Sequence, residues 1–109
     1  MIELKFNNFI FNKEMNYTVR LGRHHYDNLS PGQNILLIGP LENQRVKAHI
    51  KELIRCNFEG IARYVYKDEH DPICRDREGL IKVMQTSYGK EFNIDNNPEV
   101  TCIGFILVD

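Results

Sequence analysis

The order of hydrophobic patterns along the chain limits the fold more than any other feature of the sequence. Segments typical of β-strands occupy the first half, two segments with helical spacing follow, and one apolar strand closes the chain. A parallel sheet of βαβ units would need strands and helices to alternate. The order therefore predicts an α+β fold, with a small curved or closed sheet and helices packed against it.

Five strands are expected from the spacing of apolar residues. Alternation of apolar and polar side chains predicts half-buried strands, and short apolar runs bounded by turn residues predict buried strands. The alternating segments are 2–6, 17–21 and 44–53, and the apolar runs are 34–39 and 100–108. We expect the last of these strands to lie at the centre of the sheet.

Helical spacing of apolar residues occurs twice. It predicts one helix over 58–66 with Asn57 as its N-cap, and a second from Asp76, as N-cap, to about Ser87. Gly89 then stands where glycine is favoured, just past a helix end. We expect loops at 23–27 and 68–76, and a short helix or an irregular connector over 7–14.

Length and charge limit the function classes. With 109 residues the chain supports one compact core, so we treat 1–109 as a single domain. Fourteen Lys and Arg against fifteen Asp and Glu give a net charge of −1, which excludes a protein that coats nucleic acid by charge alone. Between positions 19 and 51, however, only Asp27 and Glu42 oppose the basic residues. A local anion-binding patch is therefore expected.

Cysteine usage and hydropathy point to a cytoplasmic protein. Cys56, Cys74 and Cys102 have no metal-type spacing and are expected to be reduced thiols. The longest apolar stretches are much shorter than the ~18 residues that a membrane span needs. We expect no membrane contact, no metal and no cofactor.

One candidate binding surface is the strand over 44–53. Arg45, Lys47, His49 and Lys51 alternate with apolar residues, so they share one face at steps of about 6.6 Å. Such a row could follow the phosphates of a nucleic-acid strand. The alternative is a solvent-exposed outer face of an antiparallel sheet.

A second candidate surface includes Thr18 and Arg20, which point the same way from their strand, with Arg23 and the pair His24-His25 nearby. A hydroxyl beside a guanidinium suits a phosphate or a carbonyl group. The alternative is that Arg20 pairs with a carboxylate and Thr18 only favours the strand. The histidine pair lacks the further ligands that a metal site needs.

Carboxylates offer a weaker candidate. Acidic residues cluster around a proline-bearing loop and alternate with basic ones, which is typical of a solvent-exposed loop; they are Asp68, Glu69, Asp71, Asp76 and Glu78. Paired acids catalyse proton transfer only where burial or proximity separates their pKa values. The sequence has no nucleophile motif and no phosphate-binding glycine loop.

Three segments together resemble a known family. Tyr17-Thr18-Val19-Arg20, the turn at 31–35 into a strand, and the helix at 80–84 followed by Tyr88-Gly89 are similar to ASCH domains, small members of the PUA-like β-barrel group. The resemblance implies an α+β barrel of about five to six strands with two to three packed helices. ASCH domains are associated with RNA, and some small members hydrolyse N4-acetylcytidine nucleosides.

The resemblance to these small amidohydrolases carries over only in part. Thr18 matches a catalytic threonine, and Arg20 matches the arginine that follows it. The catalytic lysine position falls on Met15, with Lys13 two residues away. The glutamate position falls near residues 73–74, between Glu69 and Glu78. The weak candidates for catalysis are therefore Thr18, Lys13, Glu69 and Glu78.

The leading hypothesis is an ASCH-like domain that binds RNA or a nucleotide-like ligand in a basic cleft without catalysis. Its contact residues would be Thr18, Arg20, Arg23, Arg45, Lys47 and Lys51, with Tyr17, Tyr26 or Tyr64 stacking on a base. The alternative is an amidohydrolase acting on a modified nucleoside such as N4-acetylcytidine. A further alternative is a small phage or bacterial factor that docks on an acidic protein partner.

Overall fold

A computed structural model describes residues 1–108. Its five strands form one sheet in the order β1-β3-β4-β5-β2. Strand β1 runs parallel to β3, and the other neighbouring pairs are antiparallel. The strands are β1 (Glu3–Lys5), β2 (Asn16–Leu21), β3 (Asn34–Ile38), β4 (Arg45–Asn57) and β5 (Glu99–Leu107).

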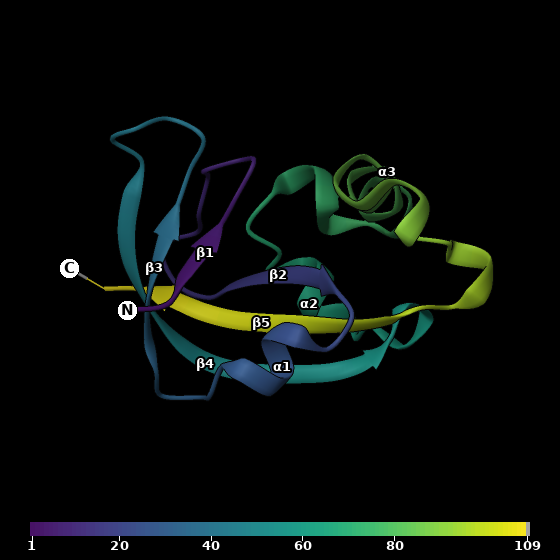
Figure 1. Cartoon of the computed structure of the whole chain (residues 1–109), viewed down its shortest axis with the longest axis horizontal. Helices are drawn as coiled ribbons and strands as arrows, with labels where there is room; N and C mark the ends of the chain where they lie inside the picture. The colour runs from purple at the N-terminus through teal and green to yellow at the C-terminus, as the bar shows by residue number, and fades with distance from the viewer. Residues whose placement is uncertain (109) are drawn as a thin grey trace.

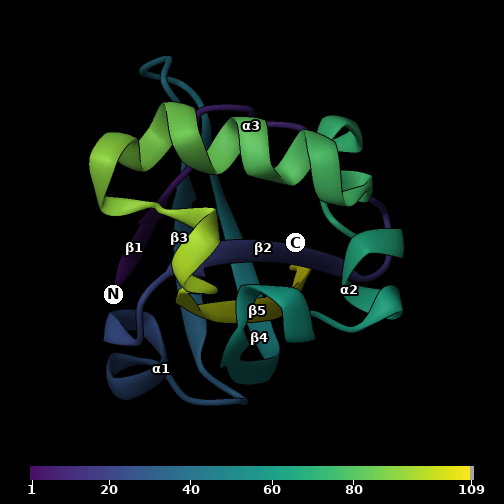
Figure 2. The same ribbon diagram turned by 90° about the vertical axis from the view of Figure 1, so that its right-hand side faces the viewer.

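Within residues 1–108, three α-helices and four short 3-10 helices accompany the sheet. The α-helices are α1 (His24–Asn28), α2 (Arg63–Lys67) and α3 (Arg77–Tyr88), and the 3-10 helices are η1 (Phe58–Gly60), η2 (Pro72–Arg75), η3 (Gly89–Glu91) and η4 (Ile94–Asn96). Helix α3 crosses the sheet on one side, whereas α1 lies beside β4 on the other (Figures 1 and 2).

The long strands β4 and β5 curve along most of the molecule (Figure 1). Their register shifts by one residue between Ile50 and Glu52, a β-bulge that bends the strand and increases its twist. The curved sheet separates two buried clusters. One, around Phe58, Leu80 and Met84, packs the sheet against α2 and α3, and the other is centred on Ile35, Ile50 and Phe105.

The outer strands approach each other through side chains. Within residues 1–108, no backbone ladder joins β1 to β2. Phe6, just after β1, is buried, and its ring centroid lies 4.7 Å from Cζ of Arg20 on β2. The same ring packs against Phe105 at 5.9 Å between centroids. This packing brings the end of β1 against β2, where a cavity lies.

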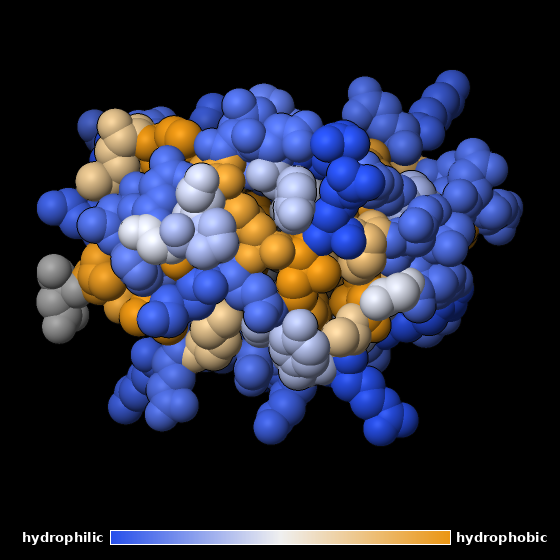
Figure 3. All heavy atoms as spheres, turned by 90° about the horizontal axis from the view of Figure 1, so that it is seen from below, coloured by the Kyte–Doolittle hydropathy of each residue, from blue (hydrophilic) through white to orange (hydrophobic). Residues whose placement is uncertain are grey.

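The surface seen from below, on the side of α1 and β4, is not uniformly hydrophilic. Apolar side chains are exposed over its middle, and hydrophilic ones project around them (Figure 3). Within residues 1–108, no helix combines the length and the hydropathy needed to cross a membrane.

The α+β class, the five strands and the helix from Asp76 are confirmed. Asp76 caps α3 through an Oδ1 that accepts from the amide of Gly79 (2.7 Å), and Gly89 ends the helix at a positive φ of 57°. Strand β5 is interior, as its apolar pattern indicates, but β4 is the central strand.

Four local predictions were wrong. Most of the loop expected over 23–27 lies in helix α1 (His24–Asn28). The single helix expected over 58–66 is two short helices, because residues 61–62 are extended between them. Asn57 accepts no capping hydrogen bond and instead donates Nδ2 to the carbonyl of Asn97 (2.7 Å). Strand β4 continues to Asn57, because it pairs with β5 along its whole second half.

Candidate functional site

A cavity of about 260 Å³ lies beside β2. Its walls come from four parts of the chain: the end of β1 with the residues after it, strand β2, the segment 69–74, and one face of α3. Segments distant in sequence therefore meet here. The apolar wall of α3 includes Leu80, Val83 and Met84, and the polar groups face it from the other three parts.

Strand β2 supplies Thr18 and Arg20, which the sequence predicted to point the same way from their strand. Alternation places both on the same face, and Nε of Arg20 donates a hydrogen bond to Oγ1 of Thr18 (3.1 Å). The guanidinium is also stacked against Phe6, and burial lowers the pKa of Arg20. Within residues 1–108, Arg20 forms no ion pair with a carboxylate, and its guanidinium lines the cavity.

The segment after α2 carries an acidic cluster into the same cavity. It pairs locally with β2, because the amide of Tyr17 donates to the carbonyl of Asp68 and the amide of His70 donates to the carbonyl of Tyr17 (both 2.9 Å). Glu69, His70 and Asp71 are consequently all buried. The solvent-exposed loop expected here is therefore wrong for these three residues, since main-chain pairing with β2 takes them out of water.

Glu69 and His70 face each other closely, with 3.4 Å between Oε1 and Nε2. His70 Nδ1 lies 2.9 Å from the carbonyl oxygen of Ile10 and must donate to it, which leaves Nε2 with the free lone pair in the neutral ring. Burial raises the pKa of Glu69 to about 8 and lowers the pKa of His70. The pair thus favours a protonated carboxyl beside a neutral imidazole at neutral pH.

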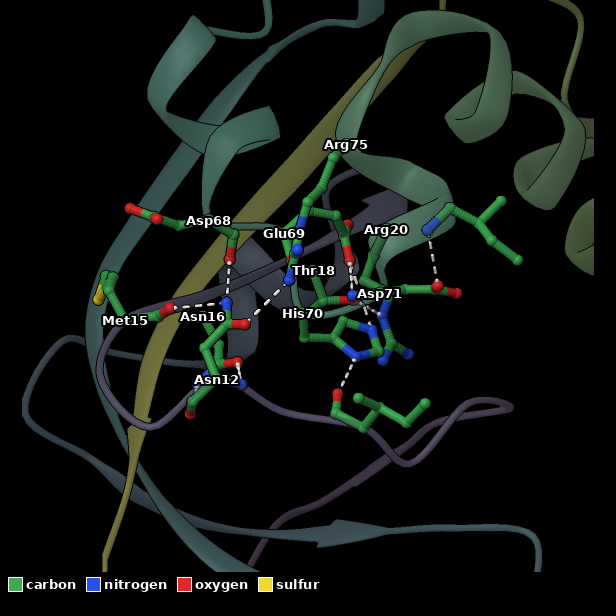
Figure 4. A network of polar contacts seen from close by, with 12 residues as sticks. Asn12, Met15, Asn16, Thr18, Arg20, Asp68, Glu69, His70, Asp71 and Arg75 are labelled. Carbon is green, nitrogen blue, oxygen red and sulfur yellow. Dashed lines mark hydrogen bonds and ion pairs between the residues drawn. The ribbon is translucent and has the colours of Figure 1, made fainter.

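Neighbouring groups fix this segment in place. Glu69 Oε1 accepts from the amide of Asp71 (3.1 Å), and Arg75 Nε donates to the carbonyl of Glu69 (3.1 Å). Arg75 also donates to Oδ1 of Asn12 (2.9 Å), and the main-chain amide of Asn12 donates to Oδ1 of buried Asn16 (2.7 Å). Figure 4 shows the asparagines on one side of the segment and Arg20 and His70 on the other.

The cavity therefore offers a cation, a hydroxyl, carboxyl groups and an imidazole within one small volume. Such a mixture suits a ligand that carries both hydrogen-bond donors and acceptors. It does not resemble a metal site, and within residues 1–108 no group of three or more His, Cys, Asp or Glu side chains is arranged to hold a metal ion.

No protein-family model and no curated protein matches the chain. Among solved structures, the crystal structure of an ASCH domain from Lactobacillus crispatus JV V101 superposes with a TM-score of 0.59 over 87% of this chain, at 9% sequence identity. The chain has the ASCH fold. It spans 65% of the length of that protein, and at this identity the match shows the fold alone.

The four catalytic candidates that the ASCH resemblance implies do not all lie together in the structure. Thr18 and Glu69 both line the cavity. Lys13 lines a different hollow together with Met15, and Glu78 is exposed at the start of α3 beside Arg77. Another lysine, Lys5 at the end of β1, does line the cavity. Thr18 and the displaced candidate Glu69 thus line the same cavity, without Lys13.

The other predicted contact residues lie outside the cavity of this ASCH fold. Arg45, Lys47 and Lys51 are exposed on β4, where Arg45 pairs with Glu3 at 3.5 Å. Arg23 is exposed and forms an ion pair with Asp27 at 3.0 Å. None of these four residues lines the cavity with Thr18 and Arg20, so contact between them and a ligand stays a prediction.

The predicted stacking tyrosines also lie away from the cavity. Tyr17 is buried, and its hydroxyl donates to Oε1 of Glu52 (2.8 Å). Tyr64 is 47% exposed and donates to the same oxygen (3.2 Å). Tyr26 is exposed under the guanidinium of Arg55, 5.9 Å from the ring centroid.

Sequence reasoning assigned no role in the site to several cavity residues, among them Lys5, Phe6 and His70. Phe6 fitted an ordinary alternating strand, and nothing in its position indicated a cation above its ring. His70 stands between two acids in a segment with no periodicity. The available signal was a histidine flanked directly by carboxylates, which indicates a coupled titratable group when the segment is buried.

Proposed function

We propose that the protein binds RNA or a nucleotide-like ligand in the cavity beside β2 and does not transform it. The observation that carries this proposal is the guanidinium of Arg20. It is supported by Thr18 and Phe6, is not paired with a carboxylate within residues 1–108, and lines a cavity whose other polar groups both donate and accept hydrogen bonds. Nucleobase edges present the same mixture of groups.

The size of the cavity favours one splayed-out base with its sugar. At about 260 Å³ it lies just below the range of roughly 300–1,000 Å³ that is usual for ligand pockets. An RNA helix cannot enter such a volume, whereas unpaired bases are commonly bound in pockets. The apolar residues of α3 provide a surface for the face of a base, opposite the polar residues.

Exposed basic residues are proposed to contribute outside the cavity. Arg45, Lys47 and Lys51 remain candidates for weak, salt-sensitive contacts with phosphates. Their spacing along β4 supports this role, which is secondary to that of Arg20 because none of the three lines the cavity.

The direct test is fluorescence anisotropy with a short single-stranded RNA at low salt. Arg20→Gln keeps a polar side chain but removes the charge, and we expect it to weaken binding about tenfold, which corresponds to 1.4 kcal/mol. Lys82→Gln, on the exposed side of α3, is the matched control and should bind like the wild type. Absence of binding, or equal affinity of the Arg20 variant, would contradict the proposal.

Hydrolysis of a modified nucleoside is the second candidate function. It is favoured by Glu69, whose carboxyl is buried in the same cavity as Thr18 and has a pKa raised to about 8 by burial. A carboxyl with such a pKa can act as an acid or a base near neutral pH. Release of cytidine from N4-acetylcytidine, lost in Thr18→Val and Glu69→Gln, would support this candidate. A lack of product would exclude that substrate.

A further inference from the structure

A second hollow, distinct from the cavity, lies where α2, η2 and the start of α3 meet. Its volume is about 680 Å³. We call this hollow the tyrosine groove. Its lining residues are basic and aromatic, with one acid: Arg63, Tyr64, Tyr66, Lys67, Arg75, Asp76 and Arg77. Nothing in the sequence patterns assigned a role to this combination.

The tyrosine groove keeps most of its positive charge. Arg63 and Lys67 are exposed and form no ion pair within residues 1–108. Arg75 is held by two neutral oxygens, those of the Glu69 carbonyl and the Asn12 side chain, so its charge is not neutralised. Arg77 differs, because Glu59 pairs with it at 2.7 Å.

An aromatic surface stands among these cations. Tyr64 is 47% exposed, and two contacts restrain its ring: the hydroxyl donates to Glu52 (3.2 Å), and the ring meets that of Tyr17 edge to face at 5.7 Å. Tyr66 is half-buried beside it. A restrained, exposed ring between cations is the arrangement on which bases of single-stranded nucleic acids stack.

We propose that the tyrosine groove binds single-stranded RNA, with Arg63, Lys67 and Arg75 at phosphates and Tyr64 under one base. This rests on the proposed function and extends it, since nucleotides adjoining the base in the cavity would occupy the groove. The two hollows share one short segment. Glu69 lines the cavity, and its carbonyl accepts from Arg75, which lines the groove, at 3.1 Å.

The test compares a single nucleotide with a single-stranded RNA decamer. We expect Arg63→Gln with Lys67→Gln to weaken decamer binding at least tenfold and to lower the salt slope by about 1.4, because about 0.7 is lost for each phosphate contact on a single strand. Binding of the single nucleotide should not change. Lys82→Gln with Lys90→Gln removes the same charge elsewhere and should leave both affinities unchanged.

Tyr64 provides a second, charge-neutral readout. Tyr64→Leu should weaken decamer binding about tenfold, whereas Tyr64→Phe keeps the stacking face and should bind like the wild type. Thermal unfolding of each variant shows whether the fold is intact. Equal affinity of the leucine variant and the wild type would overturn the role of this ring.

The outcomes separate the groove from the cavity. If the double variant binds the decamer normally while Arg20→Gln does not, the groove proposal fails and the proposed function stands. If the double variant loses the decamer while Arg20→Gln binds normally, the groove stands and the role of the cavity fails. Displacement of the decamer by polyglutamate at equal charge concentration would overturn the RNA proposal in favour of an acidic protein surface.

Discussion

At the scale of single residues, the main finding is a buried acid beside a buried histidine. Glu69 and His70 are 2% and 6% exposed, and their side chains oppose each other across 3.4 Å. Charging either group in this buried position costs free energy. The favoured state is therefore the uncharged one, with a proton on the carboxyl of Glu69 and a neutral imidazole at His70. A ligand that hydrogen-bonds to the carboxyl would shift this balance.

Stability should depend on pH through Glu69. The folded protein holds this proton up to about pH 8, whereas an unfolded chain releases it near 4.5, so the free energy of unfolding falls as pH rises between these values. The lowered pKa of His70 acts in the opposite direction below 6.5, so the effect of Glu69 is clearest from pH 6.5 to 8. We expect a slope of up to about 1.4 kcal/mol per pH unit.

Urea unfolding of Glu69→Gln across this interval checks the prediction. The variant should lose most of the slope, because its amide does not titrate. Its free energy of unfolding should therefore increase relative to that of the wild type as pH rises. Glu42→Gln, at an exposed loop position, is the matched control and should keep the slope of the wild type. A slope that survives in Glu69→Gln would assign the pH dependence to another group.

At the scale of elements, the start of α3 is held against η2. A side chain at Gly79 would collide with the carbonyl oxygen of Ile73, so only glycine allows this approach. Asp76 caps the helix in the same turn. The position of α3, and with it one wall of the cavity, depends on this contact.

Gly79→Ala should therefore lower the free energy of unfolding. We expect a loss of about 1–3 kcal/mol, typical of overpacking at a close backbone contact. This loss would occur even though alanine has a higher helix propensity than glycine. Gly60→Ala is the matched control, since its new methyl would meet only Cβ of Cys56 at 3.8 Å, an ordinary contact. Urea unfolding measures both, and an unchanged or increased stability of Gly79→Ala would contradict the packing described.

Elements were predictable where a periodic pattern was long enough. Strand β4 up to Leu53 and helix α3 follow directly from alternation and from capping at Asp76. Helix α1 could not be predicted, because its five residues show no apolar periodicity and none of them is buried. The break between η1 and α2 also left no signal, since Ile61 and Ala62 fit helical spacing while their backbone is extended.

At the scale of the whole molecule, the fold was predictable and half of the site was not. Thr18 and Arg20 could be found because strand alternation places them together. Glu69 and His70 reach the same cavity only through main-chain pairing between residues 68–70 and Tyr17, a contact between positions about 50 apart that no local pattern encodes. The basic row on β4 was equally visible in the sequence, but it lies outside the cavity.

The central claim, that the cavity beside β2 is where a nucleotide-like ligand binds, is tested most directly by a nuclear magnetic resonance titration of the labelled protein with a short single-stranded RNA. We predict the largest amide shifts at Thr18, Arg20 and the non-proline residues of 69–74, with weaker shifts around Tyr64. Shifts confined to Arg45–Lys51 on β4, or no shifts at low salt, would contradict it.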